Sequence, residues 1–191
     1  MGVAGAGIYY ADRPDVIFSA GHWINWTQNL VGTRGANKRD TGQYAPLADV
    51  DYVGTGAMLT RRQVYEEVGL LDDGFIGYGY EDTDFGIRVN KAGYRVVCYL
   101  PARVWHQPHT NIGRYSFRKK YLEGRNAIRF MNMYGSPSRW MKFVFYASLG
   151  LLYASIREGL RGNMGGVIGK ARGLYDGLRG REDFARRLLE Q

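Results

Sequence analysis

The sequence predicts a mixed α/β domain over residues 1–110, followed by a helical, basic region over residues 111–191. The chain has 191 residues, which suits about one domain, and 45% of them are hydrophobic, which excludes global disorder. Strand-like and helix-like patterns alternate in the first part, whereas helical patterns dominate the second. A single cysteine, Cys98, excludes an intrachain disulfide and a cysteine-rich metal cluster.

The first 50 residues predict one strand. The run Val3–Tyr10 is apolar and aromatic and forms a plausible strand. From there to residue 50 the chain is polar, contains Gly and Trp, and shows no helical periodicity. We therefore expect loops over most of this stretch.

The next segment predicts a strand, a glycine turn and a short helix. Val50–Val53 is strand-like and meets Gly54, Thr55 and Gly56. Thr60 and Gln63 fit a capping box, which predicts a helix that starts at Thr60. Gly69 sits where a left-handed C-terminal cap belongs, so this helix is about two turns long.

A second helix and a returning strand follow an irregular stretch. Residues 70–80 carry three glycines and predict no regular structure. From Asp82 a helix places Phe85 and Val89 on one face, and Gly93 stops it. Residues 94–100 are rich in β-branched and aromatic side chains and predict a strand that Pro101 ends.

Residues 111–191 predict helices with a strong positive charge. A helical pattern runs over residues 115–134, and residues 143–156 are 14 consecutive uncharged residues. Because a membrane span needs about 20, we interpret this stretch as an interfacial or core helix. Residues 1–110 have a net charge of −2 and residues 111–191 one of +10.

Such a basic region attracts phosphate, whether in nucleic acid, in lipid headgroups or in a phosphorylated substrate. The sequence has no RNP motif, no zinc-finger spacing and no basic region followed by heptads, so we do not expect nucleic acid as a partner. Two interpretations of this region stay open. It binds a membrane surface, or it contains a core helix whose basic face is exposed to solvent.

Three carboxylates, on Glu81, Asp82 and Asp84, stand at the start of the second predicted helix. One interpretation is helix capping, because acidic side chains are favoured at this end. Capping needs one or two acids, so a third acid after a glycine-rich loop also fits a ligand-binding or catalytic role. The spacing alone leaves both interpretations open.

His106 is a candidate partner of Asp82. A helix of about ten residues advances roughly 15 Å, and a strand of about six residues returns roughly 20 Å. The chain therefore returns to the level of the helix start, where His106 could act as metal ligand or proton-transfer partner. The alternative is an ordinary loop histidine. His109 forms an H-x-x-H pair with it, but Pro108 between them argues against a regular helix that presents both.

Several ordered blocks between residues 53 and 106 resemble a known family. They are residues 53–59 with Arg61-Arg62, residues 68–75, residues 81–88, residues 92–94 and residues 101–106. This series resembles the second half of a family 2 glycosyltransferase with the GT-A fold. The most similar subgroup is the rhamnosyltransferase-like enzymes that build polysaccharides and lipid-linked glycans.

The resemblance implies inverting transfer of a sugar from a nucleotide-sugar to an acceptor hydroxyl. It assigns the general base to Asp82 and the orientation of the acceptor or base to Glu81. It assigns coordination of a divalent cation, Mg²⁺ or Mn²⁺, to His106. The turn Gly54-Thr55-Gly56 would let the backbone approach the sugar, and a plain strand-to-helix turn is the alternative.

The sequence departs from this family in one respect. The nucleotide-binding half and its Asp-x-Asp metal motif have no counterpart, because the two Asp-x-Asp arrangements here start at Asp49 and Asp82. We therefore expect a partial GT-A fold, a C-terminal fragment that binds nucleotide-sugars weakly, holds no metal tightly, and self-associates or pairs with an N-terminal half. We expect a cytoplasmic location at the inner face of the membrane and a glycan or lipid-linked acceptor. The alternative function is a non-catalytic membrane-surface or partner-binding adaptor.

Overall fold

A computed structural model of the chain describes residues 1–27, 29–107 and 116–189. Its contacts divide into two compact units. Unit 1 comprises Met1–Asn25, Val31–Asp72 and Glu81–Pro108, and unit 2 comprises Trp26–Leu30, Asp73–Tyr80 and His109–Gln191. The sequence analysis places one boundary near residue 110, and the contacts assign two further short segments to unit 2.

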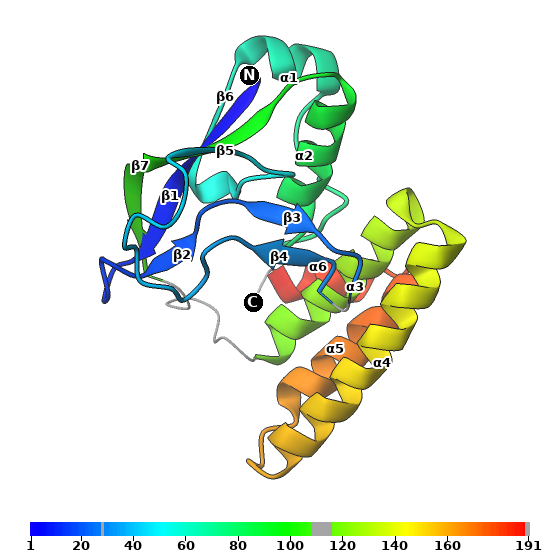
Figure 1. Cartoon of the computed structure of the whole chain (residues 1–191). Coiled ribbons are helices and arrows are strands. Elements are labelled where there is room, and N and C mark those ends of the chain that lie inside the picture. Colours follow the sequence, from blue (N-terminus) through cyan, green and yellow to red (C-terminus); the bar gives the residue numbers. More distant parts are fainter. Residues whose placement is uncertain (28, 108–115, 190–191) are drawn as a thin grey trace. The chain divides into compact units, whose positions relative to one another are not determined.

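Unit 1 is built on a mixed sheet. Its strands are β1 (Val3–Tyr10), β2 (Ile17–Ser19), β5 (Leu47–Asp49), β6 (Met58–Thr60) and β7 (Val96–His106). The order is β2-β1-β7-β5, with β6 paired to β1; β1 and β7 are parallel neighbours, as Figure 1 shows, and the other pairs are antiparallel. The strands β3 (His22–Ile24) and β4 (Val31–Thr33) form a separate antiparallel pair. The predicted mixed α/β class and the first predicted strand are confirmed.

Two helices accompany this sheet, α1 (Arg62–Val68) and α2 (Glu81–Lys91). The side chains of Phe85 and Val89 lie on one face of α2 and are buried in the core of unit 1, together with residues of β1 and β7. Gly93 follows α2 with a φ of 83°, a value that favours glycine. The second predicted helix and its glycine stop are therefore confirmed.

The predicted start of the first helix at Thr60 is wrong. Thr60 is the last residue of β6 and pairs with Val3 of β1. The residue that precedes α1 is Arg61, which makes no side-chain capping bond. The strand pairing therefore overrides the local capping pattern. Gly69 ends the helix as expected and has a φ of 81°, but its ψ of 178° differs from a left-handed helical cap.

The predicted strand end at Pro101 is also wrong, because β7 continues to His106. The β1–β7 register shifts at this point, from Ala6 opposite Tyr99 to Gly7 opposite Arg103. A proline has no N–H to donate to a ladder, and an irregularity in the pairing is where a strand tolerates it. The strand predicted at Val50–Val53 lies earlier, as β5, and the short strands β2, β3 and β4 were not predicted.

Unit 2 is helical over most of its length, as predicted. It contains α3 (Phe117–Tyr134), α4 (Pro137–Gly159), α5 (Gly165–Leu178) and α6 (Asp183–Leu189). The side chains of Ser116 and Ser136 cap α3 and α4 by accepting hydrogen bonds from backbone N–H groups. Over the described part of the chain, no helix combines the length and the apolar character that a membrane crossing requires.

The helices α3 and α5 pack backbone to backbone through glycines. Gly169, Gly173 and Gly177 recur every four residues on α5, and a Cβ atom on Gly173 would collide with the carbonyl oxygen of Tyr121. From the other side, a Cβ atom on Gly124 would lie 2.7 Å from the carbonyl oxygen of Lys170. This close approach fixes α3 and α5 side by side (Figure 1).

Candidate active site

The helix α2 carries the three predicted carboxylates in its first turn. Asp84 is fully buried and accepts hydrogen bonds from Arg88 Nε at 2.9 Å and Nη2 at 2.8 Å. Arg88 also donates to the carbonyl oxygens of Val68, at 2.6 Å, and Leu70, at 2.9 Å. Asp84 and Arg88 thus hold the end of α1 against α2, so Asp84 has a structural role.

The position of α2 depends on Gly86. A Cβ atom at Gly86 would lie 2.5 Å from both the carbonyl oxygen of Asp51 and the Cβ of Tyr52. One turn later, Asn90 Nδ2 donates to the same carbonyl of Asp51 at 2.9 Å. The middle and the end of α2 are therefore held close to the backbone at Asp51 and Tyr52.

Asp82 lies at the start of α2, as the sequence analysis predicts, and it is half-buried. Its Oδ1 accepts from the backbone N–H of Thr83 at 2.7 Å and from the Thr83 hydroxyl at 3.3 Å. Its Oδ2 lies 4.0 Å from the place of a Cβ atom on Gly54. The structure therefore brings Asp82 and the predicted glycine turn together.

The environment of Asp82 disfavours its charged form. Burial is the main cause, the charge of Glu81 adds to it, and together they raise the pKa of Asp82 to about 7. The hydrogen bonds from Thr83 act in the opposite direction. A carboxyl group with this pKa exchanges protons near neutral pH, which suits a general acid or base.

Glu81 and Tyr80 add two further features at this point. Among the described residues, the buried Oε2 atom of Glu81 has no hydrogen-bond partner. An unpaired buried oxygen atom is costly, and a role in ligand binding or catalysis is one of the reasons for which proteins keep such an atom. Tyr80, directly before α2, has a φ of 78°, which is rare for a residue with a side chain.

The turn Gly54-Thr55-Gly56 leads into a short 3₁₀ helix, Thr55–Ala57. Gly54 has an ordinary φ of −66°, and neither Gly54 nor Gly56 is among the glycines with positive φ. A Cβ atom on Gly56 would meet no heavy atom within 4 Å. Backbone conformation therefore requires glycine at neither position, and packing within the described chain does not require it at Gly56.

His106 lies at the end of β7, opposite Tyr10 of β1. Its side chain is exposed, and its ring contacts the ring of Phe18 edge to face, with centroids 5.0 Å apart. Its predicted role beside Asp82 stays a prediction. His109 lies outside the described residues.

The described residues form no ready-made site for a divalent cation. Within residues 1–27, 29–107 and 116–189, no three His, Cys, Asp or Glu side chains converge in a way that could hold a metal ion. Zinc and calcium sites usually use three or more protein ligands, whereas Mg²⁺ is commonly held by one or two carboxylates together with water and substrate phosphates. The described residues by themselves therefore do not hold a metal ion through protein ligands alone.

His22, which no pattern in the sequence singles out, has a structural role. Its ring stacks on Tyr52 with centroids 4.6 Å apart, and its two nitrogens contact the hydroxyls of Ser19 and Thr33. Burial lowers its pKa to about 4, so the ring is neutral at pH 7.

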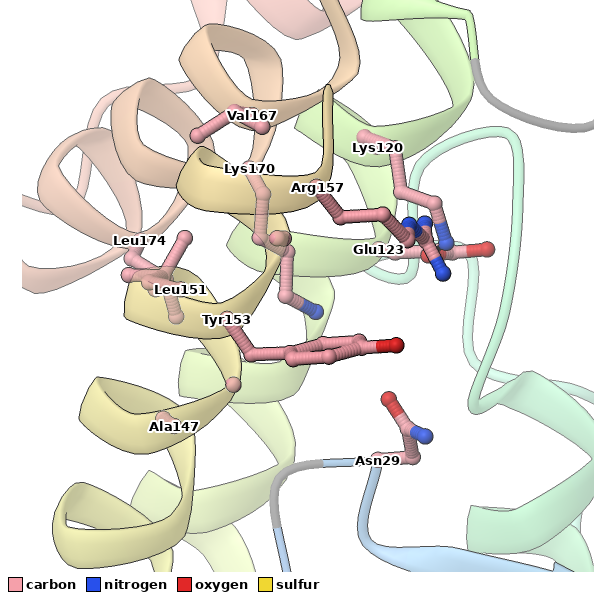
Figure 2. A pocket seen from close by; sticks show the side chains of 12 residues that line it. Asn29, Lys120, Glu123, Ala147, Leu151, Tyr153, Arg157, Val167, Lys170 and Leu174 are labelled. Carbon is pink, nitrogen blue, oxygen red and sulfur yellow. Dashed lines mark hydrogen bonds and ion pairs between the residues drawn. The ribbon is translucent and has the colours of Figure 1, made fainter. Parts of the chain in front are cut away.

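A pocket in unit 2 was not predicted either. It is lined by basic side chains from α3, α4 and α5, including Lys120, Arg157 and Lys170 (Figure 2). The net charge of +10 over residues 111–191 was the one sequence signal of an anion-binding pocket. It does not indicate which basic side chains lie together in the folded protein.

Two comparisons with known proteins bear on this chain. Residues 45–121 match a family described as the N-terminal domain of galactosyltransferase. Over 50 residues the chain is 40% identical to polypeptide N-acetylgalactosaminyltransferase 18 of Mus musculus, a match that covers 26% of this chain and 8% of that protein. The chain therefore spans a small part of this relative.

The family match covers every candidate residue of the sequence analysis. Gly54, Thr55, Gly56, Glu81, Asp82 and His106 all fall within residues 45–121. The finer resemblance to family 2 and to rhamnosyltransferase-like enzymes stays a prediction. Together, the two matches support a glycosyltransferase domain in this chain.

Proposed function

We propose that this chain takes part in inverting sugar transfer to an acceptor hydroxyl, with Asp82 as the general base. The observation that carries the proposal is the position of Asp82 Oδ2 beside Gly54, together with a pKa of about 7. The family match over the same residues supports it. The proposal includes family 2 membership and a nucleotide-sugar donor.

The proposed step is a single displacement. The acceptor oxygen attacks the anomeric carbon and forms the new C–O bond, while its proton passes to Asp82 Oδ2. The bond from the anomeric carbon to the nucleoside diphosphate breaks on the opposite face, and the bonding electrons leave with the diphosphate. A base whose pKa lies near the working pH accepts this proton most effectively. Attack from the face opposite the leaving group inverts the anomeric configuration.

Glu81 and the two glycines of the nearby turn have proposed roles in acceptor binding. The unpartnered Oε2 of Glu81 accepts a hydrogen bond from an acceptor hydroxyl, which compensates for its burial. The glycines Gly54 and Gly56 leave room for a sugar ring against the backbone. In this proposal unit 1 is the acceptor side of a GT-A domain, and the donor is recognised mainly elsewhere in the natural polypeptide or by a partner.

The test uses the whole natural polypeptide that carries this sequence. The protein is incubated with a panel of nucleoside diphosphate sugars and with glycan and lipid-linked acceptors, and NMR gives the anomeric configuration of the product. Asp82→Asn should lower transfer by roughly 100-fold or more, since general base catalysis contributes about 10²–10⁴-fold. Asp12→Asn, at an exposed carboxylate near Arg13, is the matched control.

Two results would overturn the proposal. Unchanged transfer by Asp82→Asn would remove the assignment of the base. A product that retains the anomeric configuration of the donor would exclude the single displacement.

A second function, association with a membrane surface, is favoured by the exposed face of α4. Large apolar side chains follow one another along this helix and are 48–70% exposed: Met141, Phe145, Leu149, Leu152 and Ile156. Lys142 and Arg157 on the same helix supply positive charge. An apolar stripe with basic neighbours suits the headgroup region of an anionic bilayer. This association is compatible with transfer to a lipid-linked acceptor.

Co-sedimentation with vesicles tests this association. The protein should bind phosphatidylcholine vesicles more strongly when they contain phosphatidylglycerol. The double variant Phe145→Gln/Leu152→Gln should lose this binding, and Leu59→Gln/Leu70→Gln, at two exposed leucines of unit 1, should keep it. If α4 instead joins two copies of the chain, Phe145→Gln/Leu152→Gln will convert a dimer to a monomer in analytical ultracentrifugation.

A further inference from the structure

Unit 2 contains a pocket with a volume of about 240 Å³ between α3, α4 and α5. Figure 2 shows the side chains of Lys120 and Glu123 from α3, Arg157 from α4 and Lys170 from α5 around it. The opposite part of the wall is aliphatic and includes Leu151 and Leu174. The pocket therefore combines a cationic side with an apolar side.

The lining carries more positive than negative charge. Three cations, Lys120, Arg157 and Lys170, face a single carboxylate among the lining residues, that of Glu123. Glu123 Oε2 already accepts a hydrogen bond from Lys120 Nζ at 2.7 Å. One carboxylate of the lining therefore serves two lysines. Outside the lining, Arg157 Nε donates to Glu158 Oε1 at 2.6 Å, and Arg161 lies 3.6 Å from the same oxygen. The four cations and two carboxylates of this cluster therefore leave an excess of two positive charges.

Lys170 is held in this place by the packing of α3 on α5. Its carbonyl oxygen lies 2.7 Å from the place of a Cβ atom on Gly124, so its backbone is pressed against α3. Its side chain extends into the pocket beside Tyr153 (Figure 2). Burial lowers the pKa of Lys170 to about 8, the charge of Glu123 opposes this shift, and the charge of Lys120 adds to it.

A charged ammonium group in such a place is costly unless an anion accompanies it. The protein could avoid the cost by an uncharged side chain, since methionine is similar in length. Lys120 and Arg157 each contact a carboxylate, that of Glu123 and that of Glu158, whereas Lys170 has no carboxylate of its own in the lining. An anionic ligand would therefore compensate the charge of Lys170.

We propose that this pocket binds a phosphate group. A phosphate monoester carries a charge of about −1.5 to −2 near pH 7, which is opposite in sign and similar in size to the excess charge of this cluster. Lysine binds phosphate as a point charge and arginine binds it through a planar fork, so the two residue types suit this ligand. The proposal does not depend on the role of Asp82.

The volume of the pocket and its apolar wall restrict the class of ligand further. Pockets for drug-sized molecules measure about 300–1,000 Å³, so a cavity of about 240 Å³ suits a phosphorylated headgroup better than a whole nucleotide-sugar. The aliphatic wall could contact a hydrocarbon attached to the phosphate. The phosphate could therefore come from a lipid headgroup or from a soluble phosphorylated molecule.

The experiment measures binding by calorimetry to the full chain. The probes are inorganic phosphate and dihexanoyl phosphatidic acid, which has short chains and stays dissolved. Lys170→Met should weaken the binding of both about tenfold, the equivalent of about 1.4 kcal/mol. Arg187→Met, an exposed arginine of α6 outside the pocket, is the matched control and should bind as the natural chain does.

A second variant, Glu123→Gln, should strengthen phosphate binding instead of weakening it. Glu123→Gln removes the competing carboxylate but keeps an acceptor for Lys120, so phosphate should bind more tightly. Lys170→Met removes a buried charge and should fold at least as well as the natural chain, which thermal unfolding checks.

The outcomes distinguish a lipid phosphate from a soluble phosphate, and specific binding from binding to a general basic surface. Tighter binding of dihexanoyl phosphatidic acid than of inorganic phosphate identifies a lipid source, and equal binding identifies a soluble one. The proposal is overturned if neither probe binds at millimolar concentration. It is also overturned if Lys170→Met and Arg187→Met weaken binding equally, because a general basic surface would then explain the binding.

Discussion

The Oδ2 atom of Asp82 lies 4.0 Å from the place where a Cβ atom on Gly54 would stand. The two residues are far apart in the sequence and meet because Gly86 lets α2 pack against the backbone at Asp51. Because Gly54 has no side chain, the space beside the Asp82 carboxylate is open on this side. This relationship leads to the first three predictions.

The first prediction concerns the space beside Asp82. Gly54 has a φ of −66°, and 4.0 Å is an ordinary contact distance, so Gly54→Ala should fold normally and keep most of its activity. Gly54→Val should also fold but should lower kcat/KM for the acceptor by at least tenfold, because its methyl groups fill the space beside Oδ2. Circular dichroism and transfer assays check both. Full activity of Gly54→Val would show that no acceptor approaches here.

The second prediction concerns stability against pH. The folded-state pKa of Asp82 is raised to about 7 from an ordinary value of 3.8. Between these values the folded state holds a proton that the unfolded state has released, so Asp82 lowers stability as the pH rises. Asp82→Asn removes this effect. Its free energy of unfolding should increase relative to the natural chain from pH 4 to pH 7, by up to about 1.4 kcal/mol per pKa unit, and then stay constant.

Urea unfolding of both proteins at several pH values measures this difference. The comparison cancels the contribution of His22, whose lowered pKa makes the natural chain less stable as the pH falls from 6.5 to about 4. Parallel stability curves for the two proteins would contradict the raised pKa of Asp82.

The third prediction concerns the packing of α2. Alanine favours a helix over glycine by about 1 kcal/mol, but a Cβ atom at Gly86 would lie 2.5 Å from backbone and side-chain atoms. Overpacking costs typically 1–3 kcal/mol, so Gly86→Ala should destabilise the protein and also reduce transfer through displacement of Asp82. Gly56→Ala, where no atom lies within 4 Å, is the control for stability. Equal unfolding midpoints in urea would contradict this prediction.

The fourth prediction concerns the α3–α5 packing in unit 2. A Cβ atom on Gly173 would collide with the backbone carbonyl of Tyr121, so Gly173→Ala must push the two helices apart. We expect a loss of about 1–3 kcal/mol or more and weaker phosphate binding at Lys170. Gly165→Ala on the same helix meets no atom within 4 Å and should be neutral or stabilising by up to about 1 kcal/mol. Similar melting temperatures for the two variants would contradict the packing described here.

Much of the secondary structure follows from local patterns. The burial of β1 alternates along its whole length, and the apolar spacing of Phe85 and Val89 predicts the buried face of α2. The ends of α2 and α3 follow from Gly93 and from Gly135 with Pro137. These signals succeed because the preference of a helix or a long strand is set by neighbours within a few residues.

The errors arise where distant segments compete with local preference. Thr60 joins a strand with Val3 instead of capping a helix, and Pro101 lies inside a strand because the β1–β7 register shifts around it. A local pattern holds no information about a partner strand more than 50 residues away. The short strands of residues 11–50 were not predicted for the same reason.

The sequence by itself determined the mixed α/β class, the helical C-terminal part, and the placement of Asp82 at the start of a helix. Only the tertiary structure decided that Asp84 is structural, that Asp82 Oδ2 lies beside Gly54, and that Lys120 and Lys170 line one pocket. The physical reason is close packing at Gly86 and Gly173. Backbone segments can approach each other at these points because glycine has no Cβ atom. A local sequence pattern does not show which segments approach, because this depends on the packing of the whole folded chain.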